Sequence, residues 1–309
     1  MLQDMTQEAH WENRSAVVSY LASQLIRGRL SVFLGAGASL AHGLPNWDGL
    51  LTALCAEHGI AFPPPGYPND PTPLTLATSI RGRYRDKEEF KAGVKKVLYK
   101  NAKLDFASLA SDRTFVALGS LVMASARGGV ASVMTLNYDD CLEIYLENAG
   151  FVVDSLCTPA HWASRADLAI YHPHGFLPTD PGRNDSEDIV LDQFSFSERI
   201  GATGSPWYQK IVTILRNSTV LMIGFGSGDQ NLLAMLQNAR IEHPIGTEKP
   251  PYNGVLLKAV PNSFSVDTYK KYGIYTFPVS DYVSDMPNLL YEICRVAASA
   301  RRTELGLGG

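Results

Sequence analysis

LSVFLGAGAS, residues 30–39, is the stretch that decides the fold of this chain. Its apolar residues are typical of a short buried strand, and the glycines that follow predict a tight turn where the strand ends. Similar apolar stretches recur along the chain at residues 130–137, 151–157, 168–175 and 218–226. Helical spacing of apolar residues lies between them, at 139–150, 205–217 and 229–240. Strands that alternate with helices predict an α/β fold with a doubly wound parallel sheet.

The segment between the first two strands is longer than an ordinary crossover. Residues 60–75 carry six prolines and are expected to form a loop, and residues 76–126 have a helical pattern. We therefore expect one domain over residues 1–309, with a helical insertion at about 60–128. The basic piece KEEFKAGVKKVLYKNAK within it is expected to be a solvated helix face.

Composition excludes several classes of protein. Hydrophobic residues make up 45% of the chain and charged residues 19%, which is typical of a globular protein. The formal net charge is −4 and no long basic run occurs, so direct binding to nucleic acid is not expected. The first residues, MLQDMTQEAHWENRS, lack the pattern of a secretory signal, and no apolar stretch is long enough to span a bilayer. A cytoplasmic protein with no membrane attachment is expected.

The four cysteines lie far apart, at positions 55, 141, 157 and 294, and none forms a CxxC pair. A zinc ribbon needs thiolates close in sequence, so that one turn can present two of them to the same ion. We expect reduced thiols and no metal site.

Four segments with unusual residues follow apolar stretches: GAGAS at 35–39, TLNYD at 135–139, HPHG at 172–175 and GFGS at 224–227. In a doubly wound sheet, ligands bind at the carboxyl ends of the strands. Glycines 35 and 37 would let the backbone approach a pyrophosphate, although GAGAS alone also fits a structural turn. The dinucleotide fingerprint GxGxxG is incomplete because position 40 is leucine, which disfavours a hydride-transfer enzyme.

The order GAGAS, HGLPNW, TLNYDDCLE, HPHG and a strand ending in GFG resembles the sirtuin superfamily. The resemblance covers roughly residues 28–280 without the insertion and is closest to the bacterial, zinc-ribbon-free branch of NAD hydrolases in anti-phage defence. Paired cysteines are absent, and residues 45–47 lack the arginine of the deacetylases, which puts peptide deacylation in doubt. Phe176 departs from the branch pattern, in which a serine often follows HG.

The resemblance implies a Rossmann-like fold and a NAD+ hydrolase that cleaves the nicotinamide–ribose bond, with NAD as substrate and no metal. It implies three catalytic residues: His174 as the base, Asn137 as the ligand of the ribose hydroxyls and water, and Asp139 as the partner of the nicotinamide carboxamide. The residues expected to bind the rest of NAD are Gly35, Ala36, Gly37, Ser39, Pro45, Trp47, Gly224 and Ser227.

Structural explanations exist for the same residues. His174 could be a hydrogen-bonded structural histidine, as we expect for His172 and His42, and Asn137 could cap the helix that starts near residue 139. Asp140 and Glu143 are expected to be capping and surface residues, and Trp47 suits the core as well as a pocket wall.

Two other functions remain open, namely a sirtuin-type protein deacylase or ADP-ribosyltransferase and a non-catalytic NAD- or ADP-ribose-binding scaffold. A free-running NAD hydrolase would poison its own cell, and the sequence ends in TELGLGG soon after its last expected helix. We therefore expect control by self-association into a homo-oligomer or by a partner. The resemblance implies a partner such as a HerA-type ATPase or a short Argonaute.

Overall fold

The computed structural model describes residues 8–158, 166–202, 204–226, 230–242, 252–261 and 263–304. Seven strands form one sheet within these ranges, and every neighbouring pair is parallel. The strands are β1 (Leu30–Leu34), β2 (Ser132–Thr135), β3 (Val153–Leu156), β4 (Leu168–Tyr171), β5 (Thr219–Ile223), β6 (Gly254–Lys258) and β7 (Ile274–Pro278). The predicted α/β fold with a parallel sheet is confirmed.

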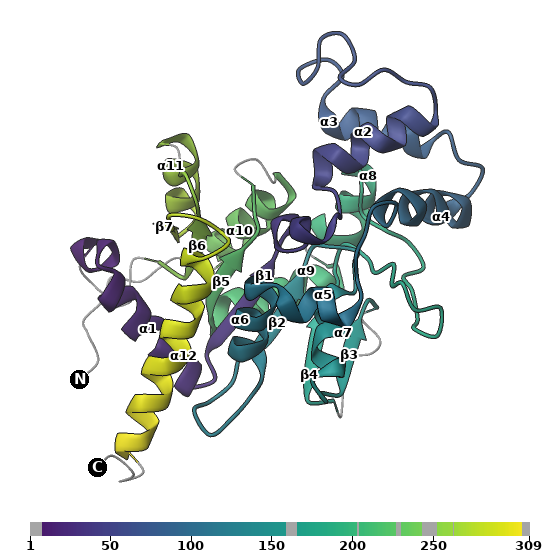
Figure 1. The fold of residues 1–309 in the computed structure, drawn as a ribbon. Helices are drawn as coiled ribbons and strands as arrows, with labels where there is room; N and C mark the ends of the chain where they lie inside the picture. Colours follow the sequence, from purple (N-terminus) through teal and green to yellow (C-terminus); the bar gives the residue numbers. More distant parts are fainter. Residues whose placement is uncertain are drawn as a thin grey trace.

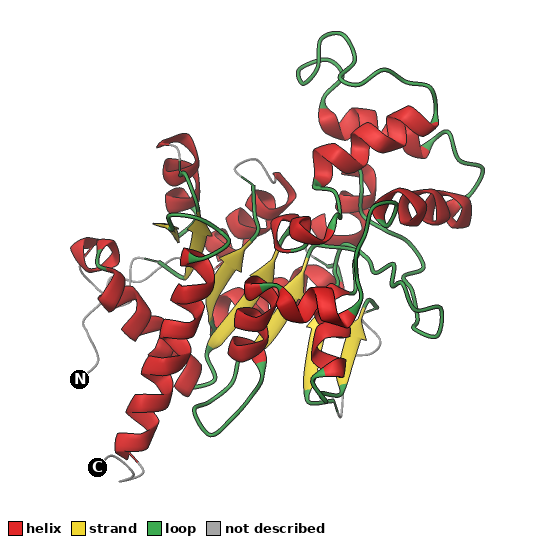
Figure 2. Ribbon diagram, viewed as in Figure 1, coloured by secondary structure: helices red, strands yellow, loops and turns green. Residues whose placement is uncertain are grey.

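Helices cover both faces of the sheet (Figures 1 and 2). One face packs against α1 (Arg14–Ile26), α6 (Arg113–Val122), α7 (Cys141–Asn148) and α12 (Asp285–Glu304). The other packs against α9 (Pro206–Asn217), α10 (Gln230–Glu242) and α11 (Ser263–Lys271). The alternation along β1 divides the two cores, since Val32 and Leu34 enter the first and Phe33 enters the second. Burial on both faces explains why the strands read as apolar runs.

The long segment between β1 and β2 contains α2 (Trp47–Glu57), α3 (Pro73–Arg81), α4 (Lys87–Leu98) and α5 (Phe106–Ser111), followed by α6. Local sequence starts these helices, as at α3, where the Thr72 hydroxyl accepts from the amide of Thr75 and Pro73 occupies the first turn. Helices α2, α3 and α4 pack together with α8 (Gln193–Phe196) into what we call the helical lobe. The strand arrowheads point toward the side of the molecule that carries this lobe (Figure 2).

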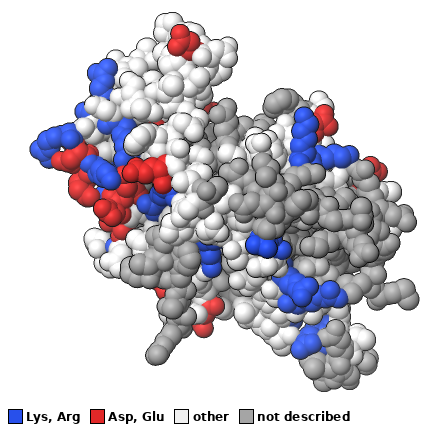
Figure 3. All heavy atoms as spheres, turned by 180° about the vertical axis from the view of Figure 1, so that it is seen from behind, with Lys and Arg blue, Asp and Glu red and all other residues white. Residues whose placement is uncertain are grey.

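Ion pairs join the helical lobe to the loop at 185–192. Arg81 of α3 contacts Asp188 at 2.7 Å, and Lys87 of α4 contacts the same carboxylate at 3.1 Å. Lys91 lies 3.4 Å from Asp185. Acidic and basic side chains accordingly intermix on the part of the surface where α4 lies (Figure 3). The loop at 185–192 is therefore held by charged side chains of the helical lobe.

The strand order β3-β4-β2-β1-β5-β6-β7 places the first strand at the centre. After β1 the chain builds the β2, β4 and β3 side of the sheet, and then crosses to β5 on the other side of β1. Connections from β1 and β5 thus leave in opposite directions, and a doubly wound sheet binds its ligand outside the carboxyl ends of the strands at such a point. The residues that follow β1, β2, β4 and β5 meet at this edge.

Candidate functional site

The glycine turn after β1 packs backbone to backbone on the end of β5. The amide of Gly35 donates to the oxygen of Ile223 and that of Gly37 to the oxygen of Gly224, both at 2.9 Å. A Cβ on Gly35 would lie 2.8 Å from the Gly224 oxygen, and one on Gly37 would lie 2.8 Å from the Gly224 Cα. Gly224 has φ +80, and a Cβ there would lie 2.5 Å from the nitrogen of Ala38. Packing alone therefore requires glycine at these three positions.

Most amides of this turn are engaged within the protein. Besides Gly35 and Gly37, the amide of Ala38 donates to the Gly35 oxygen and that of Ser39 to the Ala36 oxygen. The amide of Ala36 has no acceptor among the described residues, and Ala36 is half-buried while Gly37 is exposed. At the expected phosphate site, the amide of Ala36 is therefore available to donate a hydrogen bond. Gly37 is exposed and has no side chain, so a phosphate can approach its backbone closely.

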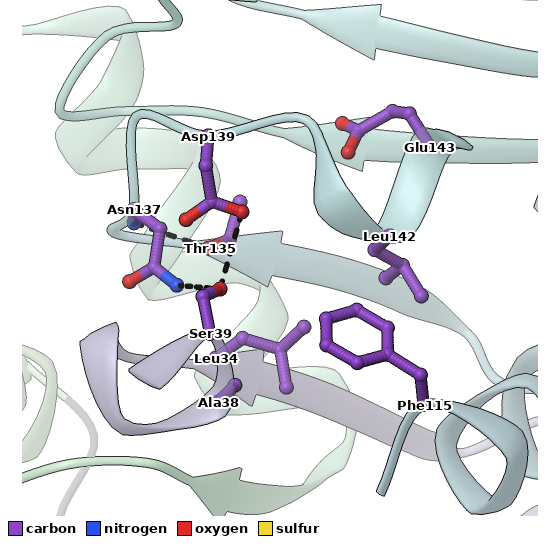
Figure 4. A pocket seen from close by; sticks show the side chains of 9 residues that line it. All are labelled: Leu34, Ala38, Ser39, Phe115, Thr135, Asn137, Asp139, Leu142 and Glu143. Carbon is purple, nitrogen blue, oxygen red and sulfur yellow. Dashed lines mark hydrogen bonds between the residues drawn. The ribbon is translucent and has the colours of Figure 1, made fainter. Parts of the chain in front are cut away.

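Asn137 lies beyond the end of β2 and reaches across to the glycine turn. Its Nδ2 donates to the Gly35 main-chain oxygen at 3.1 Å. The same Nδ2 donates to the Ser39 Oγ at 3.4 Å, and the main-chain N–H of Asn137 donates to the Thr135 Oγ1 at 3.1 Å (Figure 4). The alternative role as a helix cap is wrong, because the Asp139 carboxylate, and not Asn137, accepts from the amide of Cys141 at the start of α7. Asn137 joins two strand ends.

Ser39 and Asp139 extend this contact into a chain of hydrogen bonds. The Ser39 Oγ accepts from Asn137 and donates to the Asp139 Oδ1 at 3.1 Å. Asp139 is buried, and desolvation raises the pKa of its carboxyl, against the opposing effect of the bonds from Cys141 and Ser39. The structure thus brings together four of the residues singled out in the sequence: Gly35, Ser39, Asn137 and Asp139.

A small pocket lies beside this chain (Figure 4). Its polar wall is Ser39, Thr135, Asn137, Asp139 and Glu143, and its apolar wall is Leu34, Ala38, Phe115 and Leu142. Its cavity volume of about 10 Å³ is room for about one water molecule. Pockets that enclose a drug-sized ligand have roughly 300–1,000 Å³, so a dinucleotide would lie along the glycine turn, beside this pocket and not inside it.

The HPHG segment after β4 lies against the segment that carries Asn137. The amide of Leu177 donates to the main-chain oxygen of Tyr138 at 2.8 Å, and the His172 Nδ1 lies 3.3 Å from the main-chain oxygen of Asn137. Phe176 packs on His172, with ring centroids 4.3 Å apart. The aromatic residue at position 176 therefore has a packing role in this chain.

His174 is buried in the same loop, outside the wall of the small pocket. Its Nε2 is buried and has no hydrogen-bond partner in the described part of the chain. Burial, and then the charge of Arg199, lower the pKa of His174 to about 3, so its imidazole is neutral at physiological pH. Gly175 has φ +110, and a Cβ there would lie 2.7 Å from the Ile189 side chain, which explains the glycine after the histidine.

Asp140 and Glu143 are buried, so the expectation of surface positions was wrong. Asp140 accepts from the amide and hydroxyl of Thr179, at 2.8 and 2.9 Å. The Glu143 Oε1 lies 2.7 Å from the His172 Nε2 and also accepts from the Ser155 hydroxyl at 3.3 Å. Both carboxylates hold loops in place at the edge of the site. In the sequence, their charge indicated surface positions and gave no indication of these buried partners.

The remaining residues singled out in the sequence do not line the pocket. Pro45 and Trp47 are half-buried at the start of α2, and Trp47 packs against the core. His42 lies 2.9 Å from Asp112, as a structural histidine would. Ser227 lies outside the described residues.

All four cysteines are free thiols. Within the described ranges, no cluster of His, Cys, Asp and Glu side chains has the arrangement of a metal site. Among the helices described, none is long and apolar enough to cross a bilayer.

Comparison with known proteins agrees with this architecture. Residues 131–275 match the family model of the SIR2-like domain, a range that contains Asn137, Asp139, His174 and Gly224. The chain is 24% identical over 228 residues to the NAD(+) hydrolase ThsA of Acinetobacter baumannii (strain 532279). The alignment covers 73% of this chain and 42% of that relative. Residues 131–275 are thus similar to the SIR2-like domain, and the parallel α/β sheet agrees with that similarity.

Proposed function

We propose that this protein hydrolyses NAD at the nicotinamide–ribose bond and releases nicotinamide and ADP-ribose. The observation that carries the proposal is the hydrogen bond from the Asn137 amide to the glycine turn, at the edge where a doubly wound sheet binds its ligand. The similarity to a NAD(+) hydrolase points to the same substrate. NAD is the substrate here, and the reaction calls for no other cofactor.

The chemistry sets the demands on the site. When the C1′–N1 bond breaks, its electron pair leaves with nicotinamide, which becomes neutral and needs no general acid. The ribose passes through an oxocarbenium-like state, water attacks C1′, and a base takes the proton of that water. The site must therefore bind the ribose, position one water molecule and present a base.

Asn137 suits the first two tasks. Its Nδ2 is engaged by Gly35 and Ser39, while its side-chain oxygen has no partner among the described residues. That oxygen can accept a hydrogen bond from a ribose hydroxyl or from the attacking water. Because the nitrogen is held in place, the orientation of the oxygen is set before the substrate arrives.

His174 is the candidate base. Its imidazole is neutral at physiological pH and has a ring nitrogen free to take a proton, while burial lowers its pKa and so weakens it as a base in the unliganded protein. Its Nε2 has no partner within the described ranges, and binding of the substrate would supply one. The nicotinamide end would lie beside the small pocket, with its carboxamide toward Asp139. The pyrophosphate would then lie on Gly35, Ala36 and Gly37.

The test is to incubate the protein with NAD and to separate nicotinamide and ADP-ribose by chromatography. We expect wild-type release, abolition in His174→Ala, and unchanged release in the control His58→Ala, whose ring packs edge-to-face against Tyr84 beyond the end of α2. Full turnover in His174→Ala would remove this histidine from the mechanism. An O-acyl-ADP-ribose product with acylated peptide would support a deacylase instead.

We also propose that the activity is regulated by self-association or by a partner such as a HerA-type ATPase or a short Argonaute, as part of anti-phage defence. Unregulated hydrolysis would deplete the NAD of the cell. Light scattering together with nicotinamide release tests this, and a monomer with full constitutive turnover would contradict it.

A further inference from the structure

Arg199, in the short helical turn η4 (Ser197–Gly201), holds three separate segments together. Its Nε donates to the Pro173 oxygen at 2.7 Å, its Nη1 to the Asp188 oxygen at 3.1 Å and its Nη2 to the Cys157 oxygen at 2.6 Å. These acceptors follow β4, lie in the loop at 185–192 and follow β3. One guanidinium therefore fixes the relative positions of three loops.

One of these bonds acts directly on the peptide that enters His174. The Pro173 carbonyl belongs to the Pro173–His174 peptide, and the next carbonyl, that of His174, accepts from the Val190 amide at 2.7 Å. The backbone of His174 is thus held on both sides. Gly175, the next residue, packs closely on Ile189.

The charge of Arg199 is not explained by an ion pair. Its three acceptors are main-chain carbonyls, and in the described part of the chain no carboxylate lies within ion-pair distance of it. Burial lowers its pKa, and the ring of Trp207 lies 5.9 Å from the guanidinium carbon. Asp188 and Glu187 act on this charge from a greater distance, so its direct partners are the three carbonyls of the loops that it joins.

We propose that Arg199 is a positioning residue for His174 in the proposed NAD hydrolysis. Its planar guanidinium fixes the position of the Pro173–His174 peptide relative to the neighbouring loops. The position of this peptide in turn orients the imidazole toward C1′ of the nicotinamide ribose. Lysine cannot replace it, because the three donors of an ammonium are on one nitrogen, whereas Arg199 donates from three nitrogens of a planar group. The inference rests on the proposed function, since it concerns the base of that reaction.

Arg81 offers a matched control. It holds the same 185–192 loop from the outer side, with its Nη2 at 2.8 and 2.7 Å from the Asp188 carboxylate and its Nη1 at 3.2 Å from the Ile189 oxygen. It makes no bond to Pro173 among the contacts of the described residues. Both arginines therefore stabilise the loop, and Arg199 alone contacts the peptide of His174.

The experiment measures kcat and KM for nicotinamide release, ADP-ribose affinity by calorimetry and thermal unfolding for the wild type, Arg199→Lys, Arg199→Gln and Arg81→Gln. We expect both Arg199 variants to lose about 10²-fold in kcat, the loss that a misplaced catalytic group causes. Their ADP-ribose affinity should stay within about threefold of the wild type, because the glycine turn is untouched. Arg81→Gln should keep kcat within about threefold.

Four results would overturn the inference. The first two are a wild-type kcat in a folded Arg199→Gln and a loss of kcat in Arg81→Gln equal to that in the Arg199 variants. The other two are a loss of ADP-ribose affinity that parallels the loss of kcat, and failure of both Arg199 variants to fold. Any of these results would mean that Arg199 contributes to general stability and does not position His174. A wild type that binds ADP-ribose and releases no nicotinamide would instead defeat the proposed function itself. The two failures are therefore distinguishable.

Discussion

The side-chain amide of Asn137 donates to the main-chain oxygen of Gly35 at 3.1 Å, across 102 positions of sequence. This bond joins the residue after β2 to the turn after β1. It fixes the asparagine by its nitrogen and leaves its oxygen for a ligand. The glycine turn and the TLNYD segment, which are far apart in the sequence, are therefore one unit in the structure.

Replacement of Asn137 tests this unit. Asn137→Asp keeps the shape but removes the donor, and it places a carboxylate beside the Gly35 oxygen and near Asp139. We expect nicotinamide release to fall by at least about 10²-fold, because the ribose and water lose their oriented partner. The control is Asn148→Ala at the exposed end of α7, where the side-chain amide donates to the Ile144 oxygen. Near-normal release by Asn137→Asp would contradict this role.

Gly224 is expected to tolerate no side chain. Gly224→Ala adds the cost of a positive φ, about 1–2 kcal/mol, to a clash with the nitrogen of Ala38. We expect lower stability in urea and weaker ADP-ribose binding, because the glycine turn must move. Gly226→Ala, two residues later, meets nothing within 4 Å and should change neither quantity. Equal behaviour of the two variants would show that the interlocked glycines are not needed.

Glu143 and Glu147 lie one turn apart on α7 and should differ sharply. Glu143 and its partner His172 are almost wholly buried, with 1% and 0% of their side chains exposed, whereas Glu147 pairs with Arg183 at the surface. Breaking a buried pair costs about 3–5 kcal/mol and losing a surface pair about 0–1 kcal/mol. Glu143→Ala should therefore lower the free energy of unfolding far more than Glu147→Ala. Similar losses would mean that the His172–Glu143 contact contributes little.

The stability of the protein should depend on pH through His174. Its pKa is about 3 in the folded chain, chiefly because of burial, and about 6.5 when unfolded. Above pH 6.5 neither state binds the proton. As the pH falls from 6.5 toward 3, the unfolded state binds it and the folded state does not, so stability is lost at up to about 1.4 kcal/mol per pH unit.

Comparison with His174→Gln isolates this effect from other titrating groups. Between pH 6.5 and pH 4.5, the wild type should lose about 2–3 kcal/mol more than the variant in urea unfolding. Parallel curves for the two proteins would show that His174 is not held neutral by its surroundings.

Much of the architecture can be predicted from the sequence, because buried parallel strands read as apolar runs whose ends carry glycine and polar residues. The stretch at 30–39 and the segments TLNYD and HPHG are at the expected edge of the sheet. The carboxyl ends of parallel strands share one edge, so their order in the sequence is enough to place them together.

Other features depend on contacts that no local pattern records. The position of β4 between β3 and β2 is set by pairing, which leaves no trace in the apolar spacing. The burial of Asp140 and Glu143 depends on partners in distant loops, Thr179 and His172, so their charge alone misled the prediction. Arg199 lies in a segment with no motif, and its importance emerges only from its three carbonyl partners.

The most direct test of this account is a crystal structure of the His174→Ala variant with NAD bound. We predict the pyrophosphate on Gly35, Ala36 and Gly37, the nicotinamide ribose against the Asn137 oxygen, and the vacated space of the imidazole facing C1′. NAD bound on another surface, or with its nicotinamide ribose remote from Asn137, would contradict the claim that the glycine turn, the asparagine and the histidine serve one dinucleotide.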